Sequence, residues 1–155
     1  MRRIVLCLVG ACTCAALVAS GAPAKSGNGV LCVLHAKLSA ANETPPTAST
    51  ARGQTKIKVR QNGTIQFKTK IKNPNGETFI AGHVHRAPVG VAGPIVVPLF
   101  VPPAPATNAR HIKQKGVATP NPGTTGTDLC TNPSAYYVNY HTTAFPGGAI
   151  RGQLH

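Results

Sequence analysis

Two histidines separated by a single residue, His83 and His85, are the side chains best suited to chemistry. Residues two apart on a β-strand project from the same face, so both imidazoles can bind one metal ion. His141, in a second apolar segment, is a candidate third ligand, and His111 is a more distant candidate. Three histidines suit copper or zinc, because imidazole is a good ligand for both metals. Alternatively, these histidines are hydrogen-bonded polar residues that fix the geometry of strands and loops.

A second candidate site is a set of basic residues at alternate positions between Thr55 and Lys72. Strand alternation predicts that they share the exposed face of one ribbon, where they would bind a polyanion. Alternatively, they keep the sheet from pairing edge to edge with other molecules. Recognition of nucleic acid is not supported, because no aromatic residues are interleaved with the charges. The basic residues of this candidate site are Lys56, Lys58, Arg60, Lys68, Lys70 and Lys72.

The charge balance of the chain favours anionic partners and argues against catalysis. Lys and Arg total 16 against three acids, which gives a formal net charge of +13 at pH 7. We therefore expect an anionic glycan, a cell-envelope polymer or another exported protein as the partner. The acids Glu43, Glu77 and Asp128 are isolated in the sequence, and neither a nucleophile elbow nor a Gly-rich phosphate loop is present. A binding or structural role is therefore expected, and an enzyme is not.

The first 24 residues have the pattern of a cleaved signal peptide. A basic start at Arg2 and Arg3 precedes an apolar run, and Ala22–Ala24 offers small residues for cleavage after Ala24. A lipoprotein cleavage box ending at Cys12 is the weaker match, because the apolar run would continue past the cut. Nothing after Lys25 is long and apolar enough to span a bilayer. A secreted or periplasmic protein is therefore predicted, with residues 25–155 as one domain.

Loss of this leader would leave Cys32 and Cys130 as the only cysteines of the exported chain. Two cysteines in an oxidising compartment are expected to pair. The bridge would close a loop of nearly a hundred residues, for which the loop-entropy model gives roughly 4 to 5 kcal/mol of stabilisation. The alternative is two unrelated buried thiols, if the segments that hold them are not neighbours.

The elements that must position these residues are β-strands, because apolar and polar residues alternate and no sustained helical period occurs. The clearest element is a hairpin over residues 55–72 that turns at Asn62 and Gly63, a pair that readily takes positive φ. Long irregular loops around one weaker strand are expected between residues 101 and 135, where Pro and Gly are frequent. The further predicted strands span residues 32–39, 79–85, 94–100, 110–117, 136–142 and 149–154. About eight short strands predict an all-β, antiparallel sandwich or small barrel.

Three blocks, in this order, resemble the CHRD (chordin-type) domain family. They are residues 38–46 (LSAANETPP), 81–88 (AGHVHRAP) continuing to 93–97 (GPIVV), and 137–142 (YVNYHT) continuing to 145–154 (FPGGAIRGQL). Arg86 stands where the family usually has glycine, and Ala149 stands where it usually has an acid. The second departure removes a possible salt-bridge partner of Arg151.

The resemblance covers about residues 33–154 and implies an immunoglobulin-like antiparallel β-sandwich. It implies an exported binding or structural module with an unidentified ligand. The alternative function is a histidine-based copper or zinc site on the same sandwich. His83-Val84-His85 is also similar to the copper-binding strand of copper/zinc superoxide dismutases, but the other ligands of that enzyme have no clear counterparts here, so simple metal binding is the better expectation.

Overall fold

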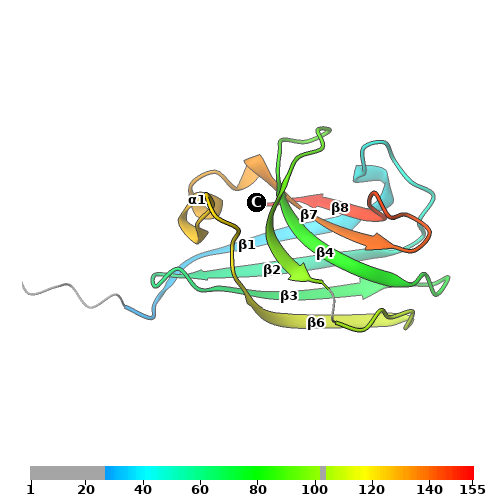
Figure 1. Ribbon diagram of the computed structural model, residues 1–155, viewed down its shortest axis with the longest axis horizontal. Helices are drawn as coiled ribbons and strands as arrows, with labels where there is room; N and C mark the ends of the chain where they lie inside the picture. The colour runs from blue at the N-terminus through cyan, green and yellow to red at the C-terminus, as the bar shows by residue number, and fades with distance from the viewer. Residues whose placement is uncertain (1–26, 102–103) are drawn as a thin grey trace, which may run out of the picture.

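A computed structural model describes residues 27–101 and 104–155, and its main elements are eight strands (Figure 1). The strands are β1 (Val30–Ser39), β2 (Arg52–Arg60), β3 (Ile65–Lys72), β4 (Phe79–Arg86), β5 (Ile95–Phe100), β6 (His111–Ala118), β7 (Tyr136–Thr142) and β8 (Ile150–Gln153). The short helical elements are η1 (Ala40–Asn42), α1 (Gly126–Thr131) and η2 (Pro133–Ala135). The prediction of about eight strands with alternating side chains is confirmed.

The strands form one antiparallel sheet in the order β5-β4-β7-β8-β1-β2-β3-β6. The β1–β8 junction is short, with a single registered pair, Ser39 and Arg151. Backbone hydrogen bonds between His35 and the terminal His155 extend this junction. The nearly closed sheet therefore folds into two layers, β5-β4-β7-β8 and β1-β2-β3-β6, that face each other as in a sandwich (Figure 1). The predicted antiparallel β-sandwich is confirmed, with the addition that one edge joins its two layers.

The hairpin of β2 and β3 shows how alternation builds the core. Gly63 takes the predicted turn with a φ of 82°, and Ile57 pairs with Phe67 across the two strands. Ile57 and Val59 are fully buried, whereas Lys56 and Lys58, which alternate with them, point outward. Every second side chain thus enters the space between the layers, where burial of apolar area is the main stabilising effect.

One buried hydrogen-bonded chain crosses this core. The Tyr140 hydroxyl of β7 donates to the Thr69 hydroxyl of β3 at 2.8 Å, and Thr69 lies 2.9 Å from the Thr55 hydroxyl. Tyr140 is fully buried, and burial raises the pKa of its hydroxyl above the usual value. The polar atoms are therefore satisfied without water, as buried hydroxyls require.

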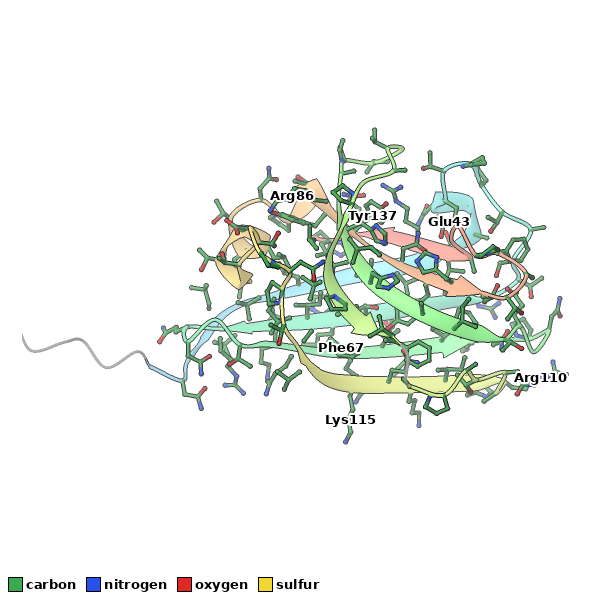
Figure 2. All side chains as sticks on the ribbon, viewed as in Figure 1. Glu43, Phe67, Arg86, Arg110, Lys115 and Tyr137 are labelled. Atoms are coloured by element: carbon green, nitrogen blue, oxygen red, sulfur yellow. A yellow bond between two sulfur atoms is a disulfide. The ribbon has the colours of Figure 1, made fainter. Side chains whose placement is uncertain are left out.

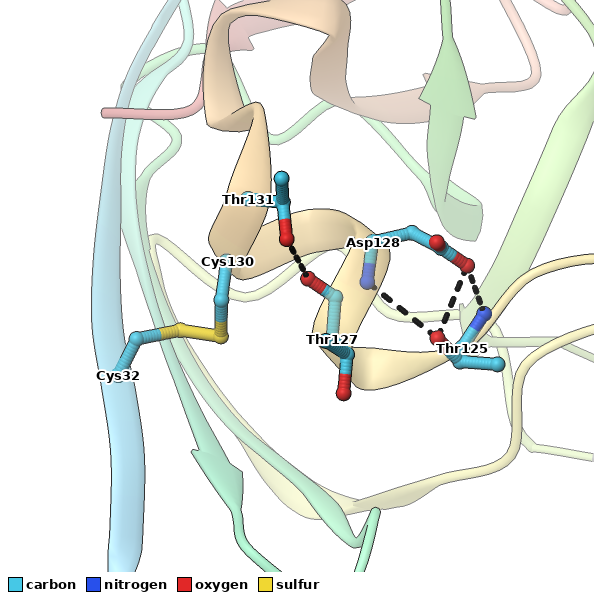
Figure 3. The surroundings of a disulfide bond; sticks show 6 residues. All are labelled: Cys32, Thr125, Thr127, Asp128, Cys130 and Thr131. Carbon is cyan, nitrogen blue, oxygen red and sulfur yellow. Dashed lines mark hydrogen bonds between the residues drawn. A yellow bond between two sulfur atoms is a disulfide. The ribbon is translucent and has the colours of Figure 1, made fainter.

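The predicted disulfide between Cys32 and Cys130 is present and ties α1 to β1, with a Cα–Cα distance of 5.9 Å (Figure 3). Helix α1 itself was not predicted, because residues 101–135 were expected to be loops around one strand. At six residues it is too short to show a helical period. It begins with a capping box, in which the Thr125 side chain bonds the Asp128 backbone and the Asp128 carboxylate accepts from the Thr125 backbone.

The predicted signal peptide and the alternative cleavage at Cys12 lie outside the described residues. Within residues 27–101 and 104–155, no helix has the length and apolar character needed to cross a membrane.

Candidate metal centre

The three candidate ligands come from the neighbouring strands β4 and β7. In the β4–β7 register His83 pairs with Asn139, His85 with Tyr137, and Ala81 with His141. Paired residues of an antiparallel sheet point to the same side, so the three imidazoles share one face. Val84 lies between His83 and His85, is fully buried and belongs to the core. The histidines therefore lie on the outer face of the β5-β4-β7-β8 layer.

The imidazoles converge. One ring nitrogen from each of His83, His85 and His141 lies within 4.8 Å of the other two. The closest pair is His83 Nδ1 and His141 Nε2, at 3.2 Å. All three side chains are at most 9% exposed. Side chains with this spacing can bind one ion between them, because nitrogen ligands of zinc lie about 2.0 to 2.1 Å from the metal.

Hydrogen bonds to backbone carbonyls fix the tautomers of two ligands. His85 Nδ1 lies 2.9 Å from the Gly93 carbonyl, and His141 Nδ1 lies 2.9 Å from the Pro146 carbonyl. A carbonyl oxygen only accepts, so both Nδ1 atoms carry the proton and both Nε2 atoms keep a lone pair. The buried Nε2 of His85 has no hydrogen-bond partner. Metal-binding histidines characteristically donate their second ring N–H in this way.

Burial keeps these imidazoles neutral. Together with the smaller effects of the nearby imidazoles of His141 and His85, it lowers the pKa of His83 to about 4. Burial also lowers the pKa of His85 and of His141, although their bonds to Gly93 and Pro146 act in the opposite direction. Neutral imidazole is the form that binds metal, so protons do not compete for the site near neutral pH.

An arginine, a tyrosine and a histidine stack beside the centre. The His85 ring lies against the Tyr137 ring, with centroids 4.8 Å apart and planes 7° apart. The Arg151 guanidinium lies over the same ring, 3.4 Å from its centroid. The Tyr137 hydroxyl accepts a hydrogen bond from the Gly93 backbone N–H. Gly93 therefore bonds both rings of the stack and holds the orientation of His85.

Gly93 can make these contacts because it has no side chain. A Cβ at this position would lie 2.0 Å from the carbonyl oxygen of Arg86. Any larger residue would therefore push the 87–94 loop away from β4.

Arg151 joins two loops to this stack. It donates to the Thr44 hydroxyl at 3.3 Å and to the Pro88 carbonyl at 2.9 Å. These contacts and the Tyr137 ring replace the partner that an acid at position 149 would offer.

One member of this cluster, Glu43, was missed as a site residue in the sequence analysis. It is 7% exposed, and its Oε2 accepts from the Asn139 amide at 3.4 Å. Burial raises the pKa of the Glu43 carboxyl to about 7, against the opposing effects of the Arg151 charge and the Thr44 backbone N–H. Glu43 Oε1 and Asn139 Oδ1 are both buried without a hydrogen-bond partner. Figure 2 shows Glu43 and Tyr137 on the same side of the molecule, above the β7 and β8 strands. The only signal in the sequence was the place of Glu43 in the 38–46 block.

The other predicted site residues lie elsewhere. His111 is on β6 of the β1-β2-β3-β6 layer, where it pairs with Lys72 of β3. It is not part of the histidine cluster. The six basic residues of the hairpin are on the outer face of the β1-β2-β3-β6 layer. The structure therefore separates the two candidate sites onto two faces.

The protein is an antiparallel β-sandwich with a buried polar cluster on one outer face. Each of the three sequence blocks contributes to that cluster, through Glu43, through His83 and His85, and through His141 and Arg151. The CHRD domain family matches residues 34–154, and the chain belongs to this family. Comparison with curated proteins and with solved structures gives no match.

Proposed function

We propose that this protein is an exported binding module whose outer-face cluster binds one copper or zinc ion through His83, His85 and His141. The observation that carries the proposal is the convergence of three buried ring nitrogens within 4.8 Å, one of which, His85 Nε2, has no hydrogen-bond partner. A buried polar atom without a partner costs about 1 to 3 kcal/mol, and coordination of a metal ion would supply the missing interaction.

The ligands of such a site follow from the tautomers. His85 and His141 would coordinate through Nε2, since their Nδ1 atoms donate to carbonyls. His83 Nδ1 donates to the lone pair of His141 Nε2 in the described structure, so His83 would coordinate through Nδ1 once its proton has moved to its own Nε2. A fourth position would be taken by water or by a ligand from a partner. Imidazole nitrogen selects zinc and copper over the hard cations magnesium and calcium.

A binding role is favoured over catalysis by the positions of the acids. Glu77 accepts from the Ser49 hydroxyl and the Thr50 backbone N–H, and Asp128 caps α1. Only Glu43 lies in the cluster, so paired carboxylate chemistry has no second acid there. Cys32 and Cys130 are consumed in the disulfide and offer no nucleophile.

Export is supported by two observations. The leader-like residues 1–24 match a signal peptide, and the disulfide belongs to an oxidising compartment. The proposed location is therefore the periplasm or the cell exterior.

Isothermal titration of the purified protein with zinc and with copper(II) tests the metal proposal. We expect one equivalent of metal to bind, and we expect His85→Ala to lower the affinity by more than tenfold. His111→Ala is the matched control, because His111 is an exposed histidine on the other layer. Circular dichroism of each variant confirms that the fold is kept. Binding that His85→Ala leaves unchanged, or binding that His111→Ala weakens equally, would contradict the proposal.

A further inference from the structure

A second surface, distinct from the metal centre, covers the outer face of the β1-β2-β3-β6 layer. We propose that this basic face binds a linear anionic polysaccharide. The structure adds residues of β1, β6 and the start of β2 to the hairpin set. The basic face consists of Lys37, Arg52, Lys56, Lys58, Arg60, Lys68, Lys70, Lys72, Lys113 and Lys115. In the described chain, the other lysine and arginine side chains are Arg86, Arg110 and Arg151.

Strand register places these cations in rows across the sheet. Lys56 pairs with Lys68, and Lys68 pairs with Lys115, so three like charges stand side by side on three strands. Lys70 pairs with Lys113 in the next row. Neighbouring strands are about 4.8 Å apart, and like charges directly opposite each other destabilise a sheet. Binding of an anionic partner would offset this repulsion between the lysines.

No acid on the protein balances the rows. Glu43 is buried against Asn139 of the opposite layer, Glu77 bonds Ser49 and Thr50, and Asp128 lies at the start of α1. The basic face is therefore a region of uniform positive potential, which raises the local concentration of polyanions.

Protection of a sheet edge does not explain the lysines of β2 and β3. Strand β2 is paired with β1 and β3, and strand β3 is paired with β2 and β6. Both are interior strands without free backbone groups for another molecule to pair with. Lysines at edges serve that purpose, but most of the basic face does not lie at an edge.

The basic face is furrowed between the rows. Three shallow hollows of about 400, 650 and 530 Å³ lie next to one another along the strands. Lys56 and Lys68 line two of them, and Lys37 and Lys70 also line two, so adjacent hollows share their walls. Figure 2 shows Lys115 projecting from β6 away from the body of the protein. A flexible chain can lie in these hollows with its acidic groups beside the ammonium groups.

The shape and composition of the basic face indicate which class of polyanion it binds. It carries no exposed Phe, Tyr or Trp in the described residues, so bases of nucleic acid would find only the imidazoles of His35 and His111 to stack on. Its exposed apolar residues, Val30, Val33 and Val117, lie toward one end. A lipid surface would meet the tips of the lysines but would leave the hollows unfilled. A carboxylated or sulfated polysaccharide chain fits both the hollows and the charges.

The test uses the purified full-length chain and a fluorescent heparin oligosaccharide in an anisotropy titration at low and moderate salt. Binding is expected at low salt and should weaken steeply as salt rises. Lys68→Gln combined with Lys115→Gln should lower the affinity by about tenfold, from roughly a three-fold contribution of each exposed contact. The control, Arg86→Gln combined with Arg110→Gln, removes the same charge from outside the basic face and should change the affinity by less than about two-fold. Thermal unfolding of both double variants checks that the fold is kept.

Equal weakening by the control would overturn the proposal, because net charge alone would then explain binding. No binding at low salt would also overturn it. In a competition assay, single-stranded DNA or vesicles of phosphatidylserine and phosphatidylcholine are added to the complex of the protein with the same oligosaccharide. Tighter binding to either of these, lost in the Lys68→Gln and Lys115→Gln variant, would assign the basic face to nucleic acid or lipid. None of these outcomes depends on metal binding at the histidines.

Discussion

Removal of the Tyr140 hydroxyl by Tyr140→Phe should destabilise the protein through the hydrogen-bonded chain between the layers. The hydroxyl is fully buried and donates to Thr69 at 2.8 Å. After the substitution Thr69 still has Thr55 as a partner at 2.9 Å, so no buried donor is left without an acceptor. The cost is therefore that of one net hydrogen bond, about 1 to 1.5 kcal/mol, and not the larger cost of an orphaned group. For a domain of this size the midpoint of thermal unfolding should fall by about 4 to 6 °C.

Urea unfolding followed by circular dichroism measures this cost. The control is Tyr136→Phe, because the Tyr136 hydroxyl makes no hydrogen bond to another residue in the described part of the chain, although its ring is equally part of the core. We expect this control to change the free energy of unfolding by less than about 0.5 kcal/mol. The reasoning is refuted if the two substitutions cost the same, since the bond between the layers would then contribute nothing measurable.

Three further predictions concern charge, pH and the disulfide. Burial raises the pKa of Glu43 from 4.5 to about 7, so ionisation of this buried carboxyl lowers the stability of the folded protein as pH rises from about 4.5 through 7. Glu43→Gln should therefore be more stable than the wild type by about 2 kcal/mol at pH 8 and equal to it at pH 4. Urea unfolding at both pH values checks this. Burial lowers the pKa of His83 from 6.5 to about 4, so the free energy of unfolding of the metal-free protein should increase between about pH 4 and 6.5. His83→Gln should flatten that part of the plot of unfolding free energy against pH. An unchanged plot would show that His83 is not the cause. Replacing Cys32 and Cys130 together by alanine opens a loop with a sequence separation of 98 residues and should lower the free energy of unfolding by about 3 to 5 kcal/mol; a cost below about 1 kcal/mol would show that the disulfide contributes little.

The strands could be predicted from the sequence because alternation is a local pattern. Apolar and polar residues alternate through Thr55–Lys72, and Asn62-Gly63 can form the turn within the same short segment. The order of the strands could not be predicted in this way. The pairing of β6 with β3 joins residues about 45 positions apart, and nothing in either strand alone specifies its neighbour. Helix α1 was missed because its only local signal is the capping pair Thr125 and Asp128.

The histidines of the candidate site could be proposed from spacing, whereas the rest of the cluster could not. His83 and His85 are two residues apart on one strand, so a shared face follows from strand geometry. His141 joins them only because β7 lies beside β4. Glu43 reaches the same cluster from the 40–47 segment, and its burial depends on loops that no periodic pattern describes. The carbonyls of Gly93 and Pro146, which fix the imidazole tautomers, are backbone atoms without any signature in the sequence.

X-ray absorption spectroscopy at the zinc edge of the protein loaded with one equivalent of zinc tests the central claim most directly. The account predicts three imidazole nitrogens at about 2.0 to 2.1 Å, with the multiple scattering typical of histidine rings. In the His85→Ala variant the number of imidazoles should fall to two. A wild-type spectrum with one imidazole or none, or one that His85→Ala leaves unchanged, would contradict a metal site built from His83, His85 and His141.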